Sequence, residues 1–215
     1  MKNTNSKRIF LVLAGCFALT AAFIIYEVGV IHQTLPLSID LTLQQVFIDI
    51  RNDFLTPLVT AITHSTDTIT IVILCAVLVI VPVTRKKYGL PLTAAALINM
   101  GIYKAMKHIF LRARPDVIYH LVEQGGYSFP SGHSATSMLV YGLLFYLAGR
   151  YCKNQKLKVL LQAACGILVV TVGPSRLYVG VHWATDVLAG WCVGAAVLMA
   201  TIYTIERMGD KNESL

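Results

Sequence analysis

Long apolar stretches separated by short polar segments make up most of the chain. A bilayer core about 30 Å thick requires roughly 20 helical residues, and the shorter stretches reach this length with their flanking residues. Because they lack the period-two alternation of barrel strands, and because backbone groups in lipid must bond internally, they predict helices. The sequence therefore predicts an all-α integral membrane protein, a single domain over residues 1–215 with six transmembrane helices. The spans are placed at about 9–31, 55–83, 89–111, 132–150, 157–174 and 180–205.

A second pattern lies between the first two stretches. Apolar residues recur there every three or four positions, with polar residues between them, at Leu43, Val46, Phe47, Ile50 and Phe54. This period predicts a short interfacial helix between the first and second spans. A polar loop with scattered apolar residues is the alternative.

The first stretch follows Lys2, Lys7 and Arg8, as the apolar core of a secretory signal would. It is longer than the roughly 7–15 residues of such a core, and no clear A-x-A cleavage site follows it. We interpret it as a retained span.

Composition agrees with a membrane protein. Hydrophobic residues make up 56% of the chain and charged residues 13%, against roughly 25% charged in an ordinary soluble domain. This argues against a soluble globule, a disordered chain and a disulfide scaffold, and the five cysteines form no C-x-x-C pair. The net charge of +7 comes from basic residues grouped beside the apolar stretches, which indicates membrane flanks rather than nucleic-acid binding.

The Lys and Arg residues also predict an orientation. Twelve of the 18 lie on the side of the predicted spans that holds both termini, so the positive-inside rule places the N- and C-termini in the cytoplasm of a cell membrane. The outer side, which normally avoids basic residues, receives the other six: Arg51, Lys104, Lys107, Arg112, Arg114 and Arg176. Their presence there requires another explanation.

Three polar clusters fall on this outer side. In the first, Lys107 and Arg114 are seven residues apart, so on a helix that continues until Pro115 ends it they share a face and converge on one anion. Basic residues that snorkel to lipid headgroups are the alternative.

The second cluster, Pro130-Ser131-Gly132-His133, precedes the fourth span. A helix that starts here offers free N–H groups and its positive dipole end to an oxyanion. Ser131 would cap the helix, Gly132 would allow close approach, and His133 would add a titratable imidazole. A plain helix cap with an incidental histidine is the alternative.

The third cluster contains Arg176, His182 and Asp186. As an i, i+4 pair on one helix face, the Asp186 carboxylate can hold one imidazole nitrogen of His182 and leave the other free to attack. A buried structural pair is the alternative.

Together the clusters place two histidines, a carboxylate, three cations and a helix start on one membrane face, which is the equipment for phosphoryl transfer without a metal. The pattern Lys107-x6-Arg114-Pro115, Pro130-Ser131-Gly132-His133 and Ser175-Arg176-x5-His182-x3-Asp186 resembles the signature of the type 2 phosphatidic acid phosphatase superfamily. That superfamily also includes glucose-6-phosphatase and the vanadium haloperoxidases. No position of the signature departs from the family pattern.

The resemblance implies a role for each residue. His182 would be the nucleophile that forms a phosphohistidine, Asp186 would fix its tautomer, and His133 would protonate the leaving oxygen. The phosphate oxygens would be held by Lys107, Arg114, Ser131, Gly132 and Arg176. No metal or other cofactor would be required.

These roles predict a lipid phosphatase acting at the outer leaflet of the bilayer. Phosphatidylglycerophosphate, phosphatidic acid and undecaprenyl diphosphate are its candidate substrates. A haloperoxidase is an alternative with less support, because soluble haloperoxidases have no need of six spans. A non-enzymatic channel, scramblase or assembly protein that binds lipid headgroups is an alternative of a different class. The sequence predicts no oligomeric state. It leaves open whether several polar residues line the substrate entry or are interfacial or structural: Glu27, His64, Asp67, Lys104, His108, Arg112 and His120.

Overall fold

The structure, a computed structural model, describes residues 36–212 of the 215. This part of the chain is mostly helical and contains no strand. In chain order the helices are α2 (Ser38–Asp49), α3 (Leu55–His64), α4 (Thr68–Ile80), α5 (Pro82–Thr84), α6 (Leu90–Phe110), α7 (Gly132–Tyr151), α8 (Gln155–Tyr178) and α9 (Ala184–Asn212). A π-helical turn, Arg85–Gly89, joins α5 to α6, and a 3-10 turn, Val117–Tyr119, lies in the loop between α6 and α7. The predicted first span, residues 9–31, lies outside the described residues.

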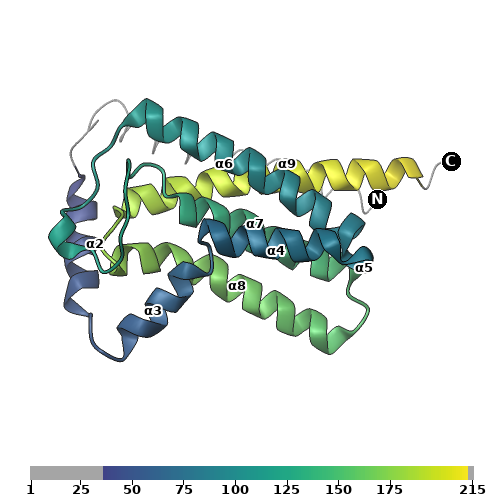
Figure 1. Cartoon of the computed structure of the whole chain (residues 1–215), viewed down its shortest axis with the longest axis horizontal. Coiled ribbons are helices and arrows are strands. Elements are labelled where there is room, and N and C mark those ends of the chain that lie inside the picture. Colours follow the sequence, from purple (N-terminus) through teal and green to yellow (C-terminus); the bar gives the residue numbers. More distant parts are fainter. Residues whose placement is uncertain (1–35, 213–215) are drawn as a thin grey trace, which may run out of the picture.

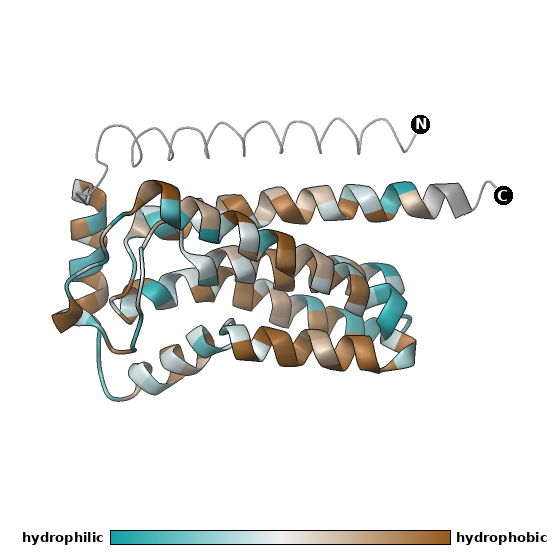
Figure 2. Ribbon diagram, turned by 45° about the horizontal axis from the view of Figure 1, so that its top comes forward, coloured by the Kyte–Doolittle hydropathy of each residue, from teal (hydrophilic) through white to brown (hydrophobic). Residues whose placement is uncertain are grey.

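Several helices have the character of membrane spans. Helices α8 and α9 are each long and apolar enough to cross a bilayer, and α3 with α4 qualifies as one bent span. Large apolar side chains are exposed along them, among them Ile73, Val77, Leu160 and Val170. Figure 2 shows hydrophobic residues along the helices and hydrophilic residues at both ends of the bundle, at the π-helical turn and at α2 with its neighbouring loops. The chain is therefore a membrane protein, because helices present such apolar faces to lipid; the number of six spans stays a prediction.

Helix α7 forms the centre of the bundle and packs against α6, α8 and α9 (Figure 1). Its residues Leu139, Val140 and Leu143 have no exposed surface. Helix α9 comes close to it at Gly190, where a Cβ atom would lie 2.4 Å from the carbonyl oxygen of Ser131. A larger residue would push the two helices apart. The first turns of α7 and α9 therefore lie side by side.

The apolar stretch of the predicted second span is broken. Helix α3 ends at His64 and α4 begins at Thr68, with a bend of 52° between them. The hydroxyls of Ser65 and Thr66 donate to carbonyl oxygens of the preceding turn, which competes with continuation of the helix. Tyr141 of α7 donates to the Ser65 carbonyl oxygen at 2.8 Å and so ties the break to the centre of the bundle.

Helix α2 lies across one end of the bundle, against α8 and α9 (Figure 1). Leu43 and Phe47 pack inward from it, whereas Phe54 lies beyond the helix and is 81% exposed. The same inner face carries Asp40, three and seven positions before these two residues, and Asp40 is completely buried. The inner face of α2 therefore combines apolar residues with two buried polar ones, Asp40 and Gln44, and the location of the helix at a membrane surface stays a prediction.

Candidate active site

The first predicted cluster lies where α6 ends. The helix stops at Phe110, and Leu111 turns the chain with a left-handed backbone (φ 51°) while its N–H bonds to the Lys107 carbonyl oxygen. The expectation of a helix that continues to Pro115 is therefore wrong, because this left-handed residue ends it first. Lys107 and Arg114 do not share a helix face.

The two cations converge through the α6–α7 loop instead. The Lys107 Nζ lies 2.6 Å from the carbonyl oxygen of Tyr127, and the Arg114 Nη2 lies 3.0 Å from the same oxygen. Arg114 also donates to the carbonyl oxygens of Gly125 and Gly126. The convergence that the spacing suggested is thus present, and oxygen atoms of the loop organise it.

Arg114 also lies against the predicted nucleophile. Its Nη1 donates to the carbonyl oxygen of Val181 at 2.7 Å and lies 3.1 Å from the Nε2 of His182. Burial lowers the pKa of Arg114 to about 10, which leaves the guanidinium charged at neutral pH. The cation therefore faces the nitrogen that the sequence assigned to attack.

The second cluster forms the start of α7, as predicted. Ser131 is the N-cap, and its Oγ accepts the backbone N–H of Ser134 at 3.3 Å. Gly132 lies against the ring of Tyr103, where a Cβ atom would lie 3.0 Å from a ring carbon. His133, in the first turn, bonds through its Nε2 to the Oδ1 of Asp67 at 2.9 Å. The helix start is thus bordered by α6 on one side and by the break between α3 and α4 on another.

In the third cluster, His182 lies just before α9 rather than on it. The helix begins at Ala184, and Asp186 in its first turn reaches back to the Nδ1 of His182 at 3.3 Å. The same carboxylate oxygen accepts the backbone N–H of Trp183 at 2.9 Å. The pair therefore forms by reach-back at a helix start, not along one helix face as the spacing predicted.

The environment of His182 favours the neutral imidazole. Only 2% of the side chain is exposed, and burial holds the pKa of His182 well below its usual value. The positive charges of Arg114, Lys107 and Arg176 lower this pKa further. In a neutral ring, the Nδ1–H donates to Asp186, and the lone pair of Nε2 is then the nucleophilic position.

Arg176 projects from the last turn of α8 and is almost completely buried. Its Nη1 donates to Thr63 Oγ1 at 2.6 Å, and its Nη2 donates to Gln124 Oε1 at 2.5 Å. Thr63 comes from α3 and Gln124 from the α6–α7 loop. The positive charge of Arg176 lowers the pKa of His182, so the third cation lies close enough to act on the ring.

Arg112 and Asp40, to which the sequence assigned no role, hold Asp186, the partner of His182, in place. Arg112 donates from Nη1 to Asp186 Oδ1 and from Nη2 to Asp40 Oδ2, both at 2.7 Å. Arg112 Nη1 also donates to the hydroxyl oxygen of Thr185, and the backbone N–H of Thr185 donates to Asp40. All three charged side chains have no exposed surface. The available sequence signal was an acid, Asp40, on the apolar face of a predicted amphipathic helix.

The remaining unassigned residues lie in different places. Asp67 contacts His133, and its second oxygen bonds to His64. His120 lies in the α6–α7 loop with its Nε2 3.1 Å from the carbonyl oxygen of Pro115, and burial lowers its pKa. Lys104 and His108 are exposed on α6, and Glu27 lies outside the described residues.

The family model of the PAP2 superfamily matches residues 88–209, which is more than half of the chain and contains all three clusters. The chain belongs to the PAP2 superfamily. This confirms the family that the three-part motif suggested.

Two curated proteins with similar sequences are phosphatases by name. Phosphatidylglycerophosphatase B of Bacillus subtilis is 39% identical over 92 residues, which are 42% of this chain and 45% of that protein. Undecaprenyl-diphosphatase of Sulfolobus acidocaldarius is 29% identical over 133 residues, which are 59% of each chain. The matched region spans about half the length of these two relatives.

Two solved structures resemble this fold. A transmembrane PAP2-type phosphatidylglycerolphosphate phosphatase from Bacillus subtilis has a TM-score of 0.74 at 28% identity, covering 92% of this chain and 96% of that one. LpxE of Aquifex aeolicus has a TM-score of 0.64 at 20% identity, covering 78% and 96% respectively, and shows the fold alone. The architecture of this chain is therefore that of membrane PAP2 proteins.

Proposed function

We propose that this protein is an integral-membrane lipid phosphatase that hydrolyses a phosphomonoester or diphosphate through a phosphohistidine on His182, without a metal. The observation that carries the proposal is the pairing of His182 Nδ1 with the buried Asp186, while Arg114 lies 3.1 Å from Nε2 and the charges of Lys107 and Arg176 also act on the ring. A neutral imidazole beside concentrated positive charge is suited to attack a phosphate, because the cations compensate the charge of the transferred group.

In the first step, His182 Nε2 attacks phosphorus and the bond from phosphorus to the lipid oxygen breaks. The electron pair of that bond goes to the leaving oxygen, which takes a proton from His133. Lys107, Arg114 and Arg176, with the Ser131 hydroxyl and the Gly132 N–H, hold the phosphoryl oxygens. Asp186 keeps the Nδ1 proton in place as the imidazole loses its lone pair.

Arg114 couples substrate binding to this attack. Its Nη1 lies 3.1 Å from the Nε2 of His182 and donates to the lone pair with which Nε2 would attack. A phosphate oxygen that takes over this donor frees the lone pair at the moment the phosphorus arrives. The nucleophile is thus exposed only when an anion occupies the site.

In the second step, water attacks the phosphohistidine and the phosphorus–nitrogen bond breaks. His133, which lost its proton in the first step, takes one from the attacking water. Phosphate leaves and both histidines return to their initial states. No external proton donor is consumed over the cycle.

A lipid substrate is supported by a cavity of about 410 Å³ between α4 and α6. Apolar side chains line its length, including Ile71, Val79, Leu97 and Met100. Its lining also includes Tyr103, whose ring lies against Gly132. An apolar chain in this cavity would place its polar end beside the phosphate-binding helix start.

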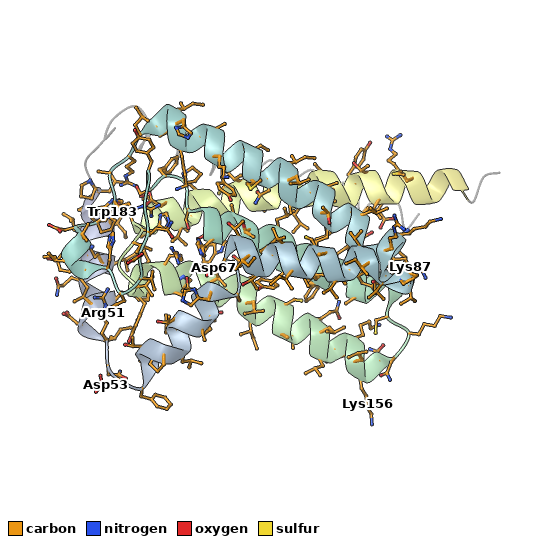
Figure 3. All side chains as sticks on the ribbon, viewed as in Figure 1. Arg51, Asp53, Asp67, Lys87, Lys156 and Trp183 are labelled. Atoms are coloured by element: carbon orange, nitrogen blue, oxygen red, sulfur yellow. The ribbon has the colours of Figure 1, made fainter. Side chains whose placement is uncertain are left out.

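The outer leaflet is proposed from the charge at the two ends of the bundle. Figure 3 places Trp183 and Arg51 at one end and Lys87 and Lys156 at the other. The latter end carries the basic flanks that the positive-inside rule assigns to the cytoplasm. The site would then face the extracytoplasmic side, and both termini the cytoplasm.

Phosphatidylglycerophosphate and undecaprenyl diphosphate are proposed as substrates because the relatives are named for acting on them. Phosphatidic acid has the same chemistry. Purified protein in detergent should release phosphate from at least one of the three with a chelator present, and His182→Ala should release none. Binding of these lipids without phosphate release would favour the alternative, a non-enzymatic channel or scramblase.

A further inference from the structure

The second histidine of the site has a carboxylate partner of its own. His133 Nε2 lies 2.9 Å from Asp67 Oδ1, and Asp67 Oδ2 lies 2.6 Å from His64 Nδ1. The exposed fraction of the side chain rises from 17% at His133 to 34% at Asp67 and 53% at His64. The three side chains therefore form a hydrogen-bonded row from the candidate site to the surface of the bundle.

The backbone around Asp67 is fixed by packing. Asp67 is the residue from which α4 restarts after the break, between α3 and the centre of the bundle (Figure 3). Tyr141 donates to the Ser65 carbonyl oxygen, and Thr70 donates across the break to the His64 carbonyl oxygen at 2.9 Å. Because this backbone is fixed, the carboxylate of Asp67 is held in one position relative to His133 at the start of α7. The break in the span thus explains why an acid, Asp67, occurs within an apolar stretch.

The charges around this row set the proton positions. His133 faces Asp67 together with the cations Arg176 and Arg114, and Asp67 faces His64, His133 and Arg176. An ionised carboxylate only accepts hydrogen bonds, so the His133 Nε2 that contacts it carries a proton. The other ring nitrogen, Nδ1, is then left for the substrate.

We propose that Asp67 is a positioning residue for His133, as Asp186 is for His182, and this inference rests on the proposed phosphatase function. Asp67 fixes the ring with one proton on Nε2, so that the second proton of the imidazolium, on Nδ1, passes to the leaving oxygen as the phosphorus–oxygen bond breaks. The same Nδ1 takes a proton from water as the phosphorus–nitrogen bond breaks. The Nε2 proton stays on the bond to Asp67 through both steps.

The first test compares leaving groups in the full-length protein. Asp67→Ala should lower kcat for a lipid monoester on the order of 10- to 100-fold, because general acid–base catalysis contributes about 10²–10⁴-fold. KM should stay within about threefold, since Asp67 does not hold the phosphate. Phosphorylation of His182 by p-nitrophenyl phosphate, whose leaving group needs no acid, should stay within a few-fold of wild type. Asp67→Asn, which keeps an acceptor, should recover part of the lost kcat.

His64→Gln is the matched control, since it removes the other partner of Asp67 at the same break. It should keep activity close to that of wild type. If it loses as much kcat as Asp67→Ala, or if Asp67→Ala loses both substrates equally, the contact with His133 is not what matters. Either result overturns the proposal.

A double-mutant cycle gives a second decision. If Asp67 acts through His133, adding Asp67→Ala to His133→Ala should cause no further loss of kcat. Losses that multiply would show that Asp67 acts elsewhere, and would overturn the proposal.

A spectroscopic measurement separates this inference from the proposed function. In protein labelled with ¹⁵N-histidine, at a pH where His133 carries a single proton, that proton should lie on Nε2 in the wild type and be shared between the two nitrogens in Asp67→Ala. Equal tautomer populations in the two proteins would overturn the positioning role whatever the activity. Failure of the wild type to hydrolyse any lipid phosphate would instead overturn the proposed function, and the tautomer measurement would still decide the role of Asp67.

Discussion

The guanidinium of Arg112 lies 2.7 Å from the carboxylate of Asp186, and neither side chain has any exposed surface. The same guanidinium lies 2.7 Å from the carboxylate of Asp40 in α2. One cation therefore compensates two buried acids, one of which orients His182. The orientation of His182 thus depends on α2, which lies outside the region that the family model matches.

Loss of Arg112 should strongly destabilise the folded protein. Arg112→Gln leaves two carboxylates buried without their cation, so the free energy of unfolding should fall by about 3–5 kcal/mol. Thermal unfolding in mild detergent measures the loss of stability, and phosphate release per folded molecule measures the loss of activity. Asp49→Asn, at an exposed position of α2, is the control. Equal stability of the two variants would contradict a supporting role for Arg112.

The sequence predicted the helices because apolar stretches of this length have few other ways to satisfy their backbone in lipid. It did not predict the break before Thr68, where Ser65 and Thr66 add only short hydroxyls to an apolar pattern. Nor did it predict that a left-handed residue ends α6 before Pro115, since no glycine at Leu111 indicates such a backbone.

The candidate site was likewise predicted only in part. Residues that contact a common ligand keep fixed spacings, so Ser131 and the pair of His182 with Asp186 were predicted, and the structure brings them into the contacts described. Their supports come from distant segments. Asp40 lies 146 residues before Asp186 in the sequence, and only the fold brings Arg112 between them.

The burial of His182 should make stability depend on pH. Its pKa in the folded protein lies well below 6.5, while the unfolded chain has the ordinary value of about 6.5. Below that pH the unfolded state binds a proton that the folded state does not, so stability is present above the unfolded pKa and falls as the pH drops. The contribution approaches about 1.4 kcal/mol per pH unit.

His182→Asn should therefore weaken the dependence of thermal stability on pH between about 7 and 5. The change in slope is the measurement, because the substitution alters the absolute stability as well. Parallel curves for wild type and His182→Asn would show that the ring protonates equally in both states, against the buried neutral imidazole.

Vanadate should inhibit at low concentration. A five-coordinate vanadate bound to His182 resembles the transition state of phosphoryl transfer, and such analogues bind much more tightly than substrates. EDTA should not inhibit, since the proposed chemistry uses only protein groups. Inhibition by EDTA that a divalent ion reverses would contradict the metal-free mechanism.

The orientation can be measured by cysteine labelling in sealed vesicles. In a background without the native cysteines, Glu123→Cys in the exposed α6–α7 loop should react with an impermeant reagent from the extracytoplasmic side. Lys156→Cys, at the start of α8, should react from the cytoplasmic side. Reaction of the 116–124 loop from the cytoplasmic side alone would exclude the proposed topology and the outer-leaflet substrate.

The two histidines should respond differently to replacement. His182→Ala should abolish turnover of every substrate, because no phosphoenzyme forms. His133→Ala should still be phosphorylated by p-nitrophenyl phosphate, since this leaving group is a weak base and needs little protonation. It should lose most activity toward a lipid monoester, whose leaving oxygen is strongly basic.

His133→Ala also lacks the base for the second step, so its phosphohistidine should accumulate. With p-nitrophenyl phosphate, a rapid burst followed by slow turnover is expected, and rapid quenching should trap label that is labile in acid and stable in base. The assigned roles would be wrong if His133→Ala carried no trapped phosphate and lost both substrates equally. They would also be wrong if His182→Ala kept substantial activity, because the attacking nitrogen would then belong to another residue.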